Sequence, residues 1–515
     1  MNKKNYVVGV DFGTSTLTMA VGSVDESGLV HVENVLSEPS RGIEGGVIQN
    51  INDVSEVLRK LKADIESGLN ISIHEAYAGV SGPFIYYETY SDHVFVRDRE
   101  SGIVSAADVE ALYQRMQGVT GEEGEEVMDR YPLNFMIDHH REVTNPVGAF
   151  SRQLSSTFAL IVSRREPLSR LHMVFRNSGM RLAGVYANSA VMSEAVLSED
   201  EKNEGAAVID LGGATTNLAV CQGGLVRYAA SIPLGGKAVD SDIKKHGVAI
   251  RDIEKLKKEF GSAVAENVPE GEEIRIKGVR GLMRRNLATI IEARLMDIID
   301  YVKAELKDSG YDRKLPYGLV LTGGMASIPD IEALFAQHTG REVRVATACY
   351  GIDSASCVRI DSTEYTSVVA LLISAAKEPG LRSAADDVEA VTNREEPSEV
   401  TVASEPERVP GGFGQGGVVF AVPYGDDKDD EKRSGDNDGG RDDNRTDDDT
   451  DSENKEEDNN DGGDDSSGGR SGFLGKLGRR IKNISRNLEN MFDDTADVRI
   501  DGDDFYVHGN DKEEL

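Results

Sequence analysis

Residues 206–221 read AAVIDLGGATTNLAVC, which is the pattern of a strand, a turn and a second strand. The apolar start favours a buried strand, and the Gly212-Gly213 pair allows a tight turn. Thr215 and Thr216 offer hydroxyl groups beside the N–H groups of that turn, an arrangement that suits phosphate oxygens. Asp210, at the strand end, is suited to hold Mg²⁺ and its waters against a polyphosphate. The stretch therefore predicts a phosphate-binding loop with a metal-binding carboxylate.

The same design occurs near the N-terminus, where residues 6–16 read YVVGVDFGTST and residues 17–24 form the expected return strand. Asp11 again ends the first strand, and Gly13, Thr14 and Ser15 follow it. One such hairpin is weak evidence, because Gly-rich turns more often close a hairpin than bind a ligand. Two copies suggest a duplicated domain that clasps one phosphate chain from both sides.

A third stretch, residues 318–327, reads GLVLTGGMAS and precedes an expected helix at residues 329–337. Gly323 and Gly324 carry no side chain, so a flat base or ribose can lie against their backbone. The competing explanation is that all three stretches are unrelated structural turns.

Together the three stretches resemble the actin, Hsp70 and sugar-kinase superfamily, in which two phosphate loops and an adenosine loop line a cleft between two similar halves. The resemblance implies an α/β class and an actin-like duplicated ATPase fold that binds ATP and Mg. It assigns phosphate contacts to Gly13, Thr14, Ser15, Gly212, Gly213, Ala214 and Thr215, the metal to Asp11 and Asp210, and the adenosine to Gly323, Gly324 and Met325.

Other stretches, over about residues 5–375, resemble the FtsA family of bacterial cell-division proteins. They are residues 73–83 (IHEAYAGVSGP), 145–148 (NPVG), 199–205 (EDEKNEG), 231–236 (SIPLGG) and 255–263 (KLKKEFGSA). This resemblance implies a peripheral protein that self-assembles head to tail and tethers FtsZ filaments to the cytoplasmic face of the inner membrane at the division site. ATP would clamp the two halves and favour the filament.

The same resemblance extends the site. Gly235 and Gly236 would let backbone N–H groups approach the terminal phosphates, and Glu254 and Lys257 match positions that hold the ribose and base. By spacing alone, Glu254 and Lys257 fit an ordinary surface pair equally well. Asn217 stands where the family usually has an acidic residue, so ATP hydrolysis is expected to be slow or absent and no catalytic residue is assigned.

The expected core spans residues 1–378. Helical periodicity at residues 53–65 followed by a strand at 74–80 indicates alternating α/β layers. The remaining expected elements are an α+β subdomain inserted at residues 84–165, with strands at 85–90, 93–96 and 158–162 and a helix at 106–117; a helix at 167–178; a second-half subdomain at 242–305, with a helix at 286–306; and a helix at 365–376 that closes the two halves on each other.

By resemblance to the family, the inserted subdomain contacts the neighbouring subunit and other division proteins, and the second-half subdomain receives the C-terminal peptide of FtsZ. The buried stripe expected in the helix at 286–306 is mostly core, so it does not identify the FtsZ-binding surface.

Composition sets further limits. The formal net charge is −34 at pH 7, which argues against nucleic-acid binding because a polyanion would be repelled. Cys221, Cys349 and Cys357 lack metal-ligand spacing, cannot all pair within one chain, and fit a reducing cytoplasm. The N-terminus does not resemble a signal peptide, and the longest apolar run, residues 368–376, is too short to span a bilayer. His139-His140 favours a solvated strand or turn over a metal site.

Residues 379–471 are expected to form a disordered acidic linker, because they carry too little apolar surface to offset the entropy of ordering. Residues 426–465 alone hold 20 acidic against 6 basic residues. An apolar island at residues 418–423 is either a short partner-binding motif or of no consequence.

Residues 472–492 restore a helical period with one apolar face flanked by basic residues. Such a helix is about 30 Å long, but its charges argue against spanning, so it is expected to lie in the interface of an anionic membrane. A helix docked on the protein's own core and a nucleic-acid arm are less favoured. The membrane-binding candidates are Phe473, Leu474, Lys476, Leu477, Arg480, Ile481, Ile484, Leu488 and Met491. The acidic tail at residues 493–515 has no assigned role.

Two other classes of function remain at this point. A sugar kinase needs a base facing a sugar pocket, and an Hsp70-like ATPase needs a β-rich peptide-binding domain after residue 380. A further possibility is another actin-like scaffold, such as PilM or MreB. The insertion at 84–165 together with the late amphipathic helix favours FtsA over PilM and MreB.

Overall fold

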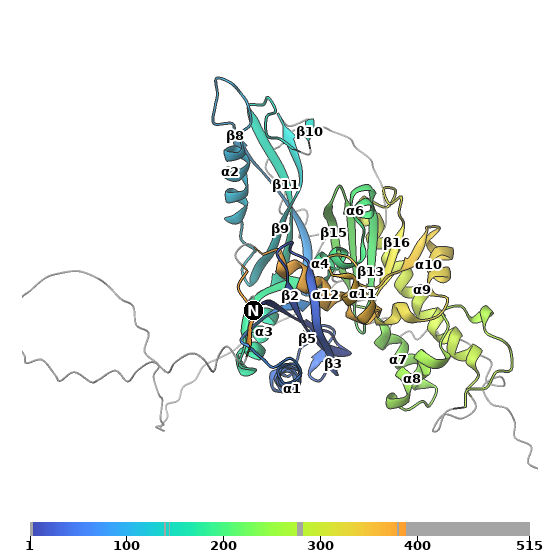
Figure 1. Ribbon diagram of the computed structural model, residues 1–515. Helices are drawn as coiled ribbons and strands as arrows, with labels where there is room; N and C mark the ends of the chain where they lie inside the picture. Colours follow the sequence, from blue (N-terminus) through green and yellow to red (C-terminus); the bar gives the residue numbers. More distant parts are fainter. Residues whose placement is uncertain (1–3, 139–140, 144, 276–281, 379–380, 388–515) are drawn as a thin grey trace, which may run out of the picture. The chain divides into compact units, whose positions relative to one another are not determined.

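The computed structural model describes residues 4–138, 141–143, 145–275, 282–378 and 381–387, and these belong to one compact unit (Figure 1). His139-His140, the apolar island at 418–423, the helix expected at 472–492 with all its membrane-binding candidates, and the tail at 493–515 lie outside the described residues. Within them, no helix is both long and apolar enough to cross a membrane.

The first half is built on a five-stranded sheet with the order β12-β7-β1-β2-β3. β1, β2 and β3 are antiparallel neighbours, whereas β7 and β12 run parallel to β1. The bounds are β1 Asn5–Phe12, β2 Thr16–Val24, β3 Val30–Pro39, β7 Glu75–Val80 and β12 Arg181–Ala187. The central strand β1 is almost entirely buried, as its apolar sequence predicts.

The second half repeats this order as β15-β14-β13-β16-β17. β13, β14 and β15 are antiparallel neighbours, and β16 and β17 run parallel to β13. The bounds are β13 Ala206–Leu211, β14 Thr216–Gln222, β15 Leu225–Ile232, β16 Leu319–Thr322 and β17 Val343–Val345. The duplicated α/β fold predicted from the two hairpins is therefore confirmed.

Helices cover the first sheet and join the halves. α1 (Ile51–Leu69) begins at Asn50, whose side chain accepts from the N–H groups of Asn52 and Asp53, and it buries the predicted apolar stripe. α3 (Arg165–Asn177) packs against α1. α12 (Thr366–Ala376) is mostly apolar, is buried along nearly its whole length, and lies in one hydrophobic cluster with β1, β2, β13 and β14. α12 thus bridges the two sheets, as expected for the helix that closes the halves.

Short helices connect the halves after β12. They are α4 (Asn188–Val191), α5 (Ser193–Val196) and α6 (Glu199–Glu204). α12 packs against α4 and α5.

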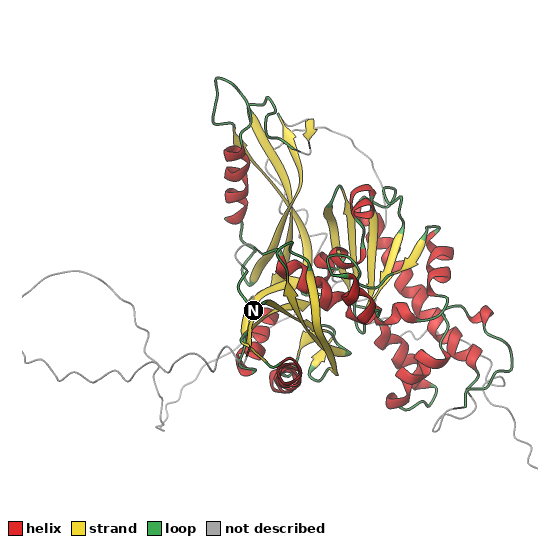
Figure 2. Cartoon of the chain, in the orientation of Figure 1, coloured by secondary structure: helices red, strands yellow, loops and turns green. Residues whose placement is uncertain are grey.

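The inserted subdomain is a four-stranded antiparallel sheet, with the order β10-β9-β11-β8, and one helix, α2, packed along β8 and β11 (Figure 2). The bounds are β8 Ile85–Phe95, α2 Ala106–Gln117, β9 Glu125–Ile137, β10 Arg141–Val143 and β11 Gln153–Arg164. The strands expected at 85–90 and 93–96 are one continuous strand, because β8 pairs with β11 without interruption.

The region around the subdomain expected at 242–305 is helical, and its first helix begins before residue 242 and its last ends after residue 305. Its elements are α7 Gly236–Lys245, α8 Ile250–Phe260, η1 Ala265–Asn267 and α9 Arg284–Ser309. The remaining elements of this half are η2 Gly324–Ser327, α10 Ile331–Thr339, α11 Ser354–Arg359 and η3 Thr363–Tyr365. The apolar stripe of α9 is buried in the core, as its sequence predicts.

The linker is predicted to begin at residue 379, but the folded part of the chain continues to residue 387. β18 (Ala385–Asp387) pairs antiparallel with β6 (Ile71–Ile73) of the first half. A separate short hairpin of that half consists of β4 (Ile43–Glu44) and β5 (Val47–Ile48). Ala384 and Ala385 are fully buried, and the Ala384 N–H donates to Tyr6 O at 2.8 Å. Residues 381–387 read LRSAADD, which carries no strand pattern, and the open edge of β6 supplies their hydrogen-bond partners.

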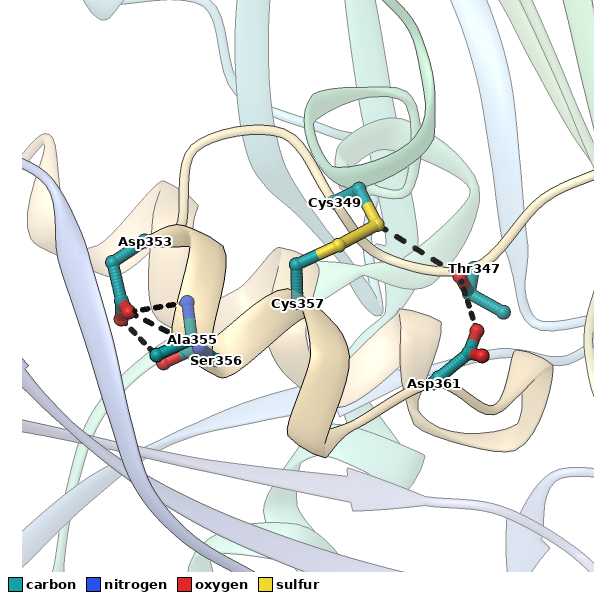
Figure 3. Close-up of a disulfide and its surroundings, with 7 residues drawn as sticks. All are labelled: Thr347, Cys349, Asp353, Ala355, Ser356, Cys357 and Asp361. Atoms are coloured by element: carbon teal, nitrogen blue, oxygen red, sulfur yellow. Dashed lines mark hydrogen bonds between the residues drawn. A yellow bond between two sulfur atoms is a disulfide. The ribbon is translucent and has the colours of Figure 1, made fainter.

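Two of the three cysteines are paired. Cys349 and Cys357 form a disulfide across the turn that leads into α11, while Cys221 is buried and free (Figure 3). Asp353 caps α11 by accepting from the N–H groups of Ala355 and Ser356 within the same turn. The expectation of thiols kept reduced thus fails for this pair, because the turn brings the two Cα atoms to 4.9 Å.

Candidate functional site

The first hairpin turns through Gly13, Thr14 and Ser15, here called loop 1, between β1 and β2. A Cβ on Gly13 would lie 2.5 Å from Thr16 O, so only glycine fits the turn. Residues 40–46 brace the loop: Ser40 Oγ donates to Gly13 O at 2.6 Å, and the Gly46 N–H donates to Thr14 Oγ1 at 3.0 Å. Loop 1 is therefore braced by hydrogen bonds from the neighbouring segment.

The second hairpin turns through Gly212, Gly213, Ala214 and Thr215, here called loop 2, between β13 and β14. The Gly212 N–H donates to Thr215 O at 3.0 Å, which closes the tight turn predicted from the Gly pair. Thr216 is fully buried and its hydroxyl donates to Leu234 O at 2.8 Å. Of the two threonine hydroxyls expected beside the turn, that of Thr216 therefore serves the packing of the hairpin.

The two loops touch. A Cβ on Gly213 would lie 2.2 Å from Ser15 Oγ, so the second glycine of loop 2 faces the last residue of loop 1. The chain thus brings together two phosphate-type loops that are about 200 residues apart in the sequence. The paired motifs predict two loops on either side of one phosphate chain, and the structure places these two loops next to each other.

A carboxylate stands at the end of each first strand, and Asp210 is buried whereas Asp11 is half-buried. Asp11 accepts from Asn188 Nδ2 at 2.7 Å, and Asp210 accepts from Asn217 Nδ2 at 3.0 Å and from Ser367 Oγ at 3.4 Å. Burial raises the pKa of Asp11 to about 7, the Asn188 hydrogen bond opposes that rise, and the charge of Asp210 adds to it. Burial likewise raises the pKa of Asp210, against the hydrogen bonds from Asn217 and Ser367.

These two carboxylates fit a hydrated divalent cation. Their charges repel one another in a desolvated place, a cost that a cation would offset. Asn188 Oδ1 and Asn217 Oδ1 are buried acceptors without a hydrogen-bond partner, so each presents an oxygen to a donor that the described chain does not supply. No cluster of three or more metal-ligating side chains exists among the described residues, but Mg²⁺ bound with phosphates needs only one or two carboxylates.

The start of α7 packs directly on loop 2. The Gly236 N–H donates to Gly212 O at 3.0 Å, and a Cβ on Gly235 would lie 2.6 Å from the same oxygen. The two glycines were expected to let N–H groups approach phosphates. In the structure they allow close packing of α7 against loop 2, and the Gly236 N–H group is bonded to that loop.

The third Gly-rich stretch lies beside Asp210. Gly323 has φ +89, and a Cβ there would lie 2.3 Å from Asp210 Oδ1, so the backbone follows the carboxylate closely. Gly324 is exposed, whereas Met325 is buried with its sulfur against Gly236. The stretch at 323–325, which the sequence predicts to bind the adenosine, therefore lies beside Asp210 and the start of α7.

The predicted ribose and base contacts lie on α8. Lys257 is buried and pairs with Asp240 at 2.7 Å and Glu254 at 2.8 Å. Burial lowers the pKa of Lys257, but the two carboxylates outweigh burial and raise it above its usual range. Lys258 pairs with Glu364 at 2.8 Å, and Glu364 is the residue nearest to a Cβ on Gly324. The ion pairs thus connect α8 to the stretch at 323–325.

Sequence reasoning missed four polar residues of this region. They are Ser81, Asn188, Lys237 and Ser367. Ser81 Oγ accepts from Asn217 Nδ2 at 3.1 Å, a hydrogen bond between the two halves. Asn188 follows a strand end and Lys237 follows the Gly235-Gly236 pair, so both stand at positions where a polar residue signals a site. Ser367 lies in an apolar helix and gives no such signal.

The described chain matches known proteins over the same regions. The family profile "Cell division protein FtsA" matches residues 207–370, and the profile "SHS2 domain inserted in FTSA" matches residues 87–162. The second range agrees with the inserted four-stranded sheet.

Whole proteins agree with the profiles. Cell division protein FtsA of Pseudomonas aeruginosa is 30% identical over 331 residues, which cover 62% of this chain and 78% of that protein. The Bacillus subtilis protein of the same name is 30% identical over 359 residues, covering 68% of this chain and 80% of that protein.

Among solved structures, a chain of the PilM-PilN type IV pilus biogenesis complex superposes with a TM-score of 0.50 at 13% identity, covering 72% of this chain and 99% of that one. This likeness concerns the fold alone. The duplicated sheets, the inserted subdomain and the matched relatives agree: the fold is actin-like, and the chain belongs to the FtsA family of cell division proteins.

Proposed function

We propose that this chain is an ATP-binding cell-division scaffold whose two halves clamp one Mg·ATP. The observation that carries the proposal is the contact of loop 1 with loop 2, each beside a carboxylate whose pKa is raised by desolvation. Backbone N–H groups of both loops suit phosphate oxygens, and Asp11 and Asp210 suit the metal. Mg²⁺ would neutralise charge on the phosphates and relieve the repulsion between the carboxylates.

The adenosine would lie in the second half. Gly323, Gly324 and Met325 offer a backbone surface for the base, and Glu254 and Lys257 stand on the adjoining helix α8.

Hydrolysis should be slow or absent. Asn217 donates to Asp210 and stands where the family usually has an acidic residue, and an amide cannot take a proton from water. The nucleotide would then act as a structural clamp that favours the filament-forming state, and turnover would only reset it.

The scaffold would assemble head to tail and tether FtsZ filaments to the cytoplasmic face of the inner membrane. The amphipathic pattern of residues 472–492, with basic residues beside an apolar face, supports anchoring on anionic lipid. The subdomain at 242–305 would receive the FtsZ C-terminal peptide, and the inserted subdomain at 84–165 would contact the neighbouring subunit and other division proteins.

The test is sedimentation of the full chain with anionic liposomes and FtsZ, with and without Mg·ATP. We expect the protein to carry FtsZ into the pellet. A variant without residues 472–492 should stay in the supernatant while binding Mg·ATP with unchanged affinity in calorimetry. Sedimentation that persists without this segment would contradict the anchor, and FtsZ left in the supernatant by the membrane-bound protein would contradict the tether.

A further inference from the structure

Lys237 touches both phosphate-type loops. It is the second residue of α7, and its N–H group donates to Gly213 O of loop 2 at 2.6 Å. Its side-chain ammonium crosses to the other half and donates to Thr14 O of loop 1 at 3.0 Å. The same residue is therefore fixed to loop 2 by its backbone and joined to loop 1 by its charge.

The charge of Lys237 is not neutralised by a contact. The described part of the chain holds no carboxylate in ion-pair contact with its ammonium, whereas Lys257 of the same subdomain has two such partners. Asp240, the nearest acidic neighbour in sequence, is engaged by Lys257 at 2.7 Å. Burial lowers the pKa of Lys237, against the charges of Asp240 and Glu44. A cation bonded only to a neutral carbonyl gains strongly from a phosphate in its place.

The position of the ammonium indicates which phosphate it would meet. The adenosine candidates Glu254, Lys257 and residues 323–325 all belong to the second half. Thr14 belongs to the first half, so an ammonium bonded to Thr14 O stands at the far end of a phosphate chain that starts from those residues.

Resting on the nucleotide site proposed above, we propose that Lys237 selects a nucleoside triphosphate over a diphosphate. With a diphosphate bound, the ammonium keeps its hydrogen bond to Thr14 O. With a triphosphate bound, it exchanges that neutral acceptor for the terminal phosphate. The exchange replaces a link between the two halves by a link through the nucleotide, so the same lysine reports which nucleotide is present.

The test is calorimetry on the full chain with Mg·ADP and with Mg·AMPPNP, an analogue that resists hydrolysis. Lys237→Met keeps the aliphatic stem and removes the charge. We expect its affinity for AMPPNP to fall about tenfold or more and its affinity for ADP to change less than twofold, because one charge-assisted hydrogen bond is lost only with the triphosphate. Lys237→Arg should retain most of the preference.

Lys244→Met is the matched control, since Lys244 is exposed on the same helix. It should leave both affinities unchanged. The ratio of the two affinities is measured within one variant, so a general loss of folded protein does not imitate the expected result. Equal losses for both nucleotides in Lys237→Met, or no loss for either, would overturn the assignment. A wild-type chain that binds neither nucleotide would instead reject the nucleotide site itself.

Discussion

The two hairpins at the centre of the molecule are built alike but hold their carboxylates differently. In the first, Asp11 is paired in register with Thr18, and the amide that binds it comes from Asn188, far along the chain. In the second, Asp210 is paired with Asn217, and that same residue supplies the amide. The amide that binds Asp11 lies in the connection between the halves, whereas the amide that binds Asp210 lies on the same hairpin as Asp210.

This difference shows how a duplicated motif becomes asymmetric. Asn217 donates to Ser81 of the first half as well as to Asp210, so a buried hydrogen bond joins the second hairpin to the first half. The first hairpin is joined to the connecting helix α4 by the hydrogen bond from Asn188 to Asp11. A change in the relative position of the halves would therefore alter the surroundings of both carboxylates, by two different routes.

The largest effect should come from removing either carboxylate. Asp11→Ala and Asp210→Ala should each weaken Mg·ATP binding about 100-fold, or about 2.7 kcal/mol, because each removes a metal ligand from one half. Calorimetry measures both. Undiminished affinity in the double variant would break the comparison altogether, since neither hairpin would then hold the metal.

The next effect concerns the amide of the second hairpin. Asn217→Asp places a second carboxylate beside buried Asp210, and we expect a loss of about 2 kcal/mol in the free energy of unfolding without metal. Thermal unfolding in the presence of a chelator measures it, and Mg·ATP should restore part of the loss. Asn52→Asp, exposed in the first turn of α1, is the control and should be close to neutral. An equal Tm for Asn217→Asp and wild type would mean that this position is not desolvated.

The first hairpin should show a particular pH dependence. The pKa of Asp11 in the folded protein is about 7, above its ordinary value of 3.8, so the folded state binds the proton more tightly. That stabilisation is complete below pH 3.8 and is lost as the pH rises through 7, at up to about 1.4 kcal/mol per pH unit.

Metal-free wild type should therefore lose Tm between pH 5 and pH 7 faster than Asp11→Asn, which has no proton to lose there. Differential scanning calorimetry over this range measures the two slopes. Parallel curves for the two proteins would show that Asp11 titrates normally and that the first carboxylate is not desolvated like the second.

The smallest effect should come from the link between the halves. Ser81→Ala removes the acceptor of Asn217 Nδ2 and should cost about 1 kcal/mol of stability. Ser91→Ala, which removes an exposed hydroxyl pair with Thr157 inside the inserted subdomain, is the control for a hydrogen bond that does not cross the halves. If both substitutions leave Tm equally unchanged, the cross-half hydrogen bond contributes nothing.

The sequence predicted the repeated parts well, because each hairpin carries its own local signals. Apolar strands, Gly turns and terminal Asp residues are all adjacent in the chain. The spacing of apolar residues at three and four positions predicts α1, α2 and α9. Local signals also located the two turns that become loop 1 and loop 2.

The parts that the sequence did not predict depend on distant partners. β18 forms because β6 offers an open edge, and nothing in the acidic residues 385–387 indicates a strand. Asn188 acts on Asp11 across a long sequence separation. Lys237 was missed because its importance lies in a side chain that crosses to Thr14. The Cys349–Cys357 pair depends on a turn whose spacing carries no special motif.

β18 also decides where mechanical load would enter the protein. Any pull on the chain beyond residue 387 reaches the body first through the pairing of β18 with β6 and the bond from Ala384 to Tyr6, at the N-terminal strand of the first half. If the tail is anchored to a surface, tension passes into that sheet before it reaches α12.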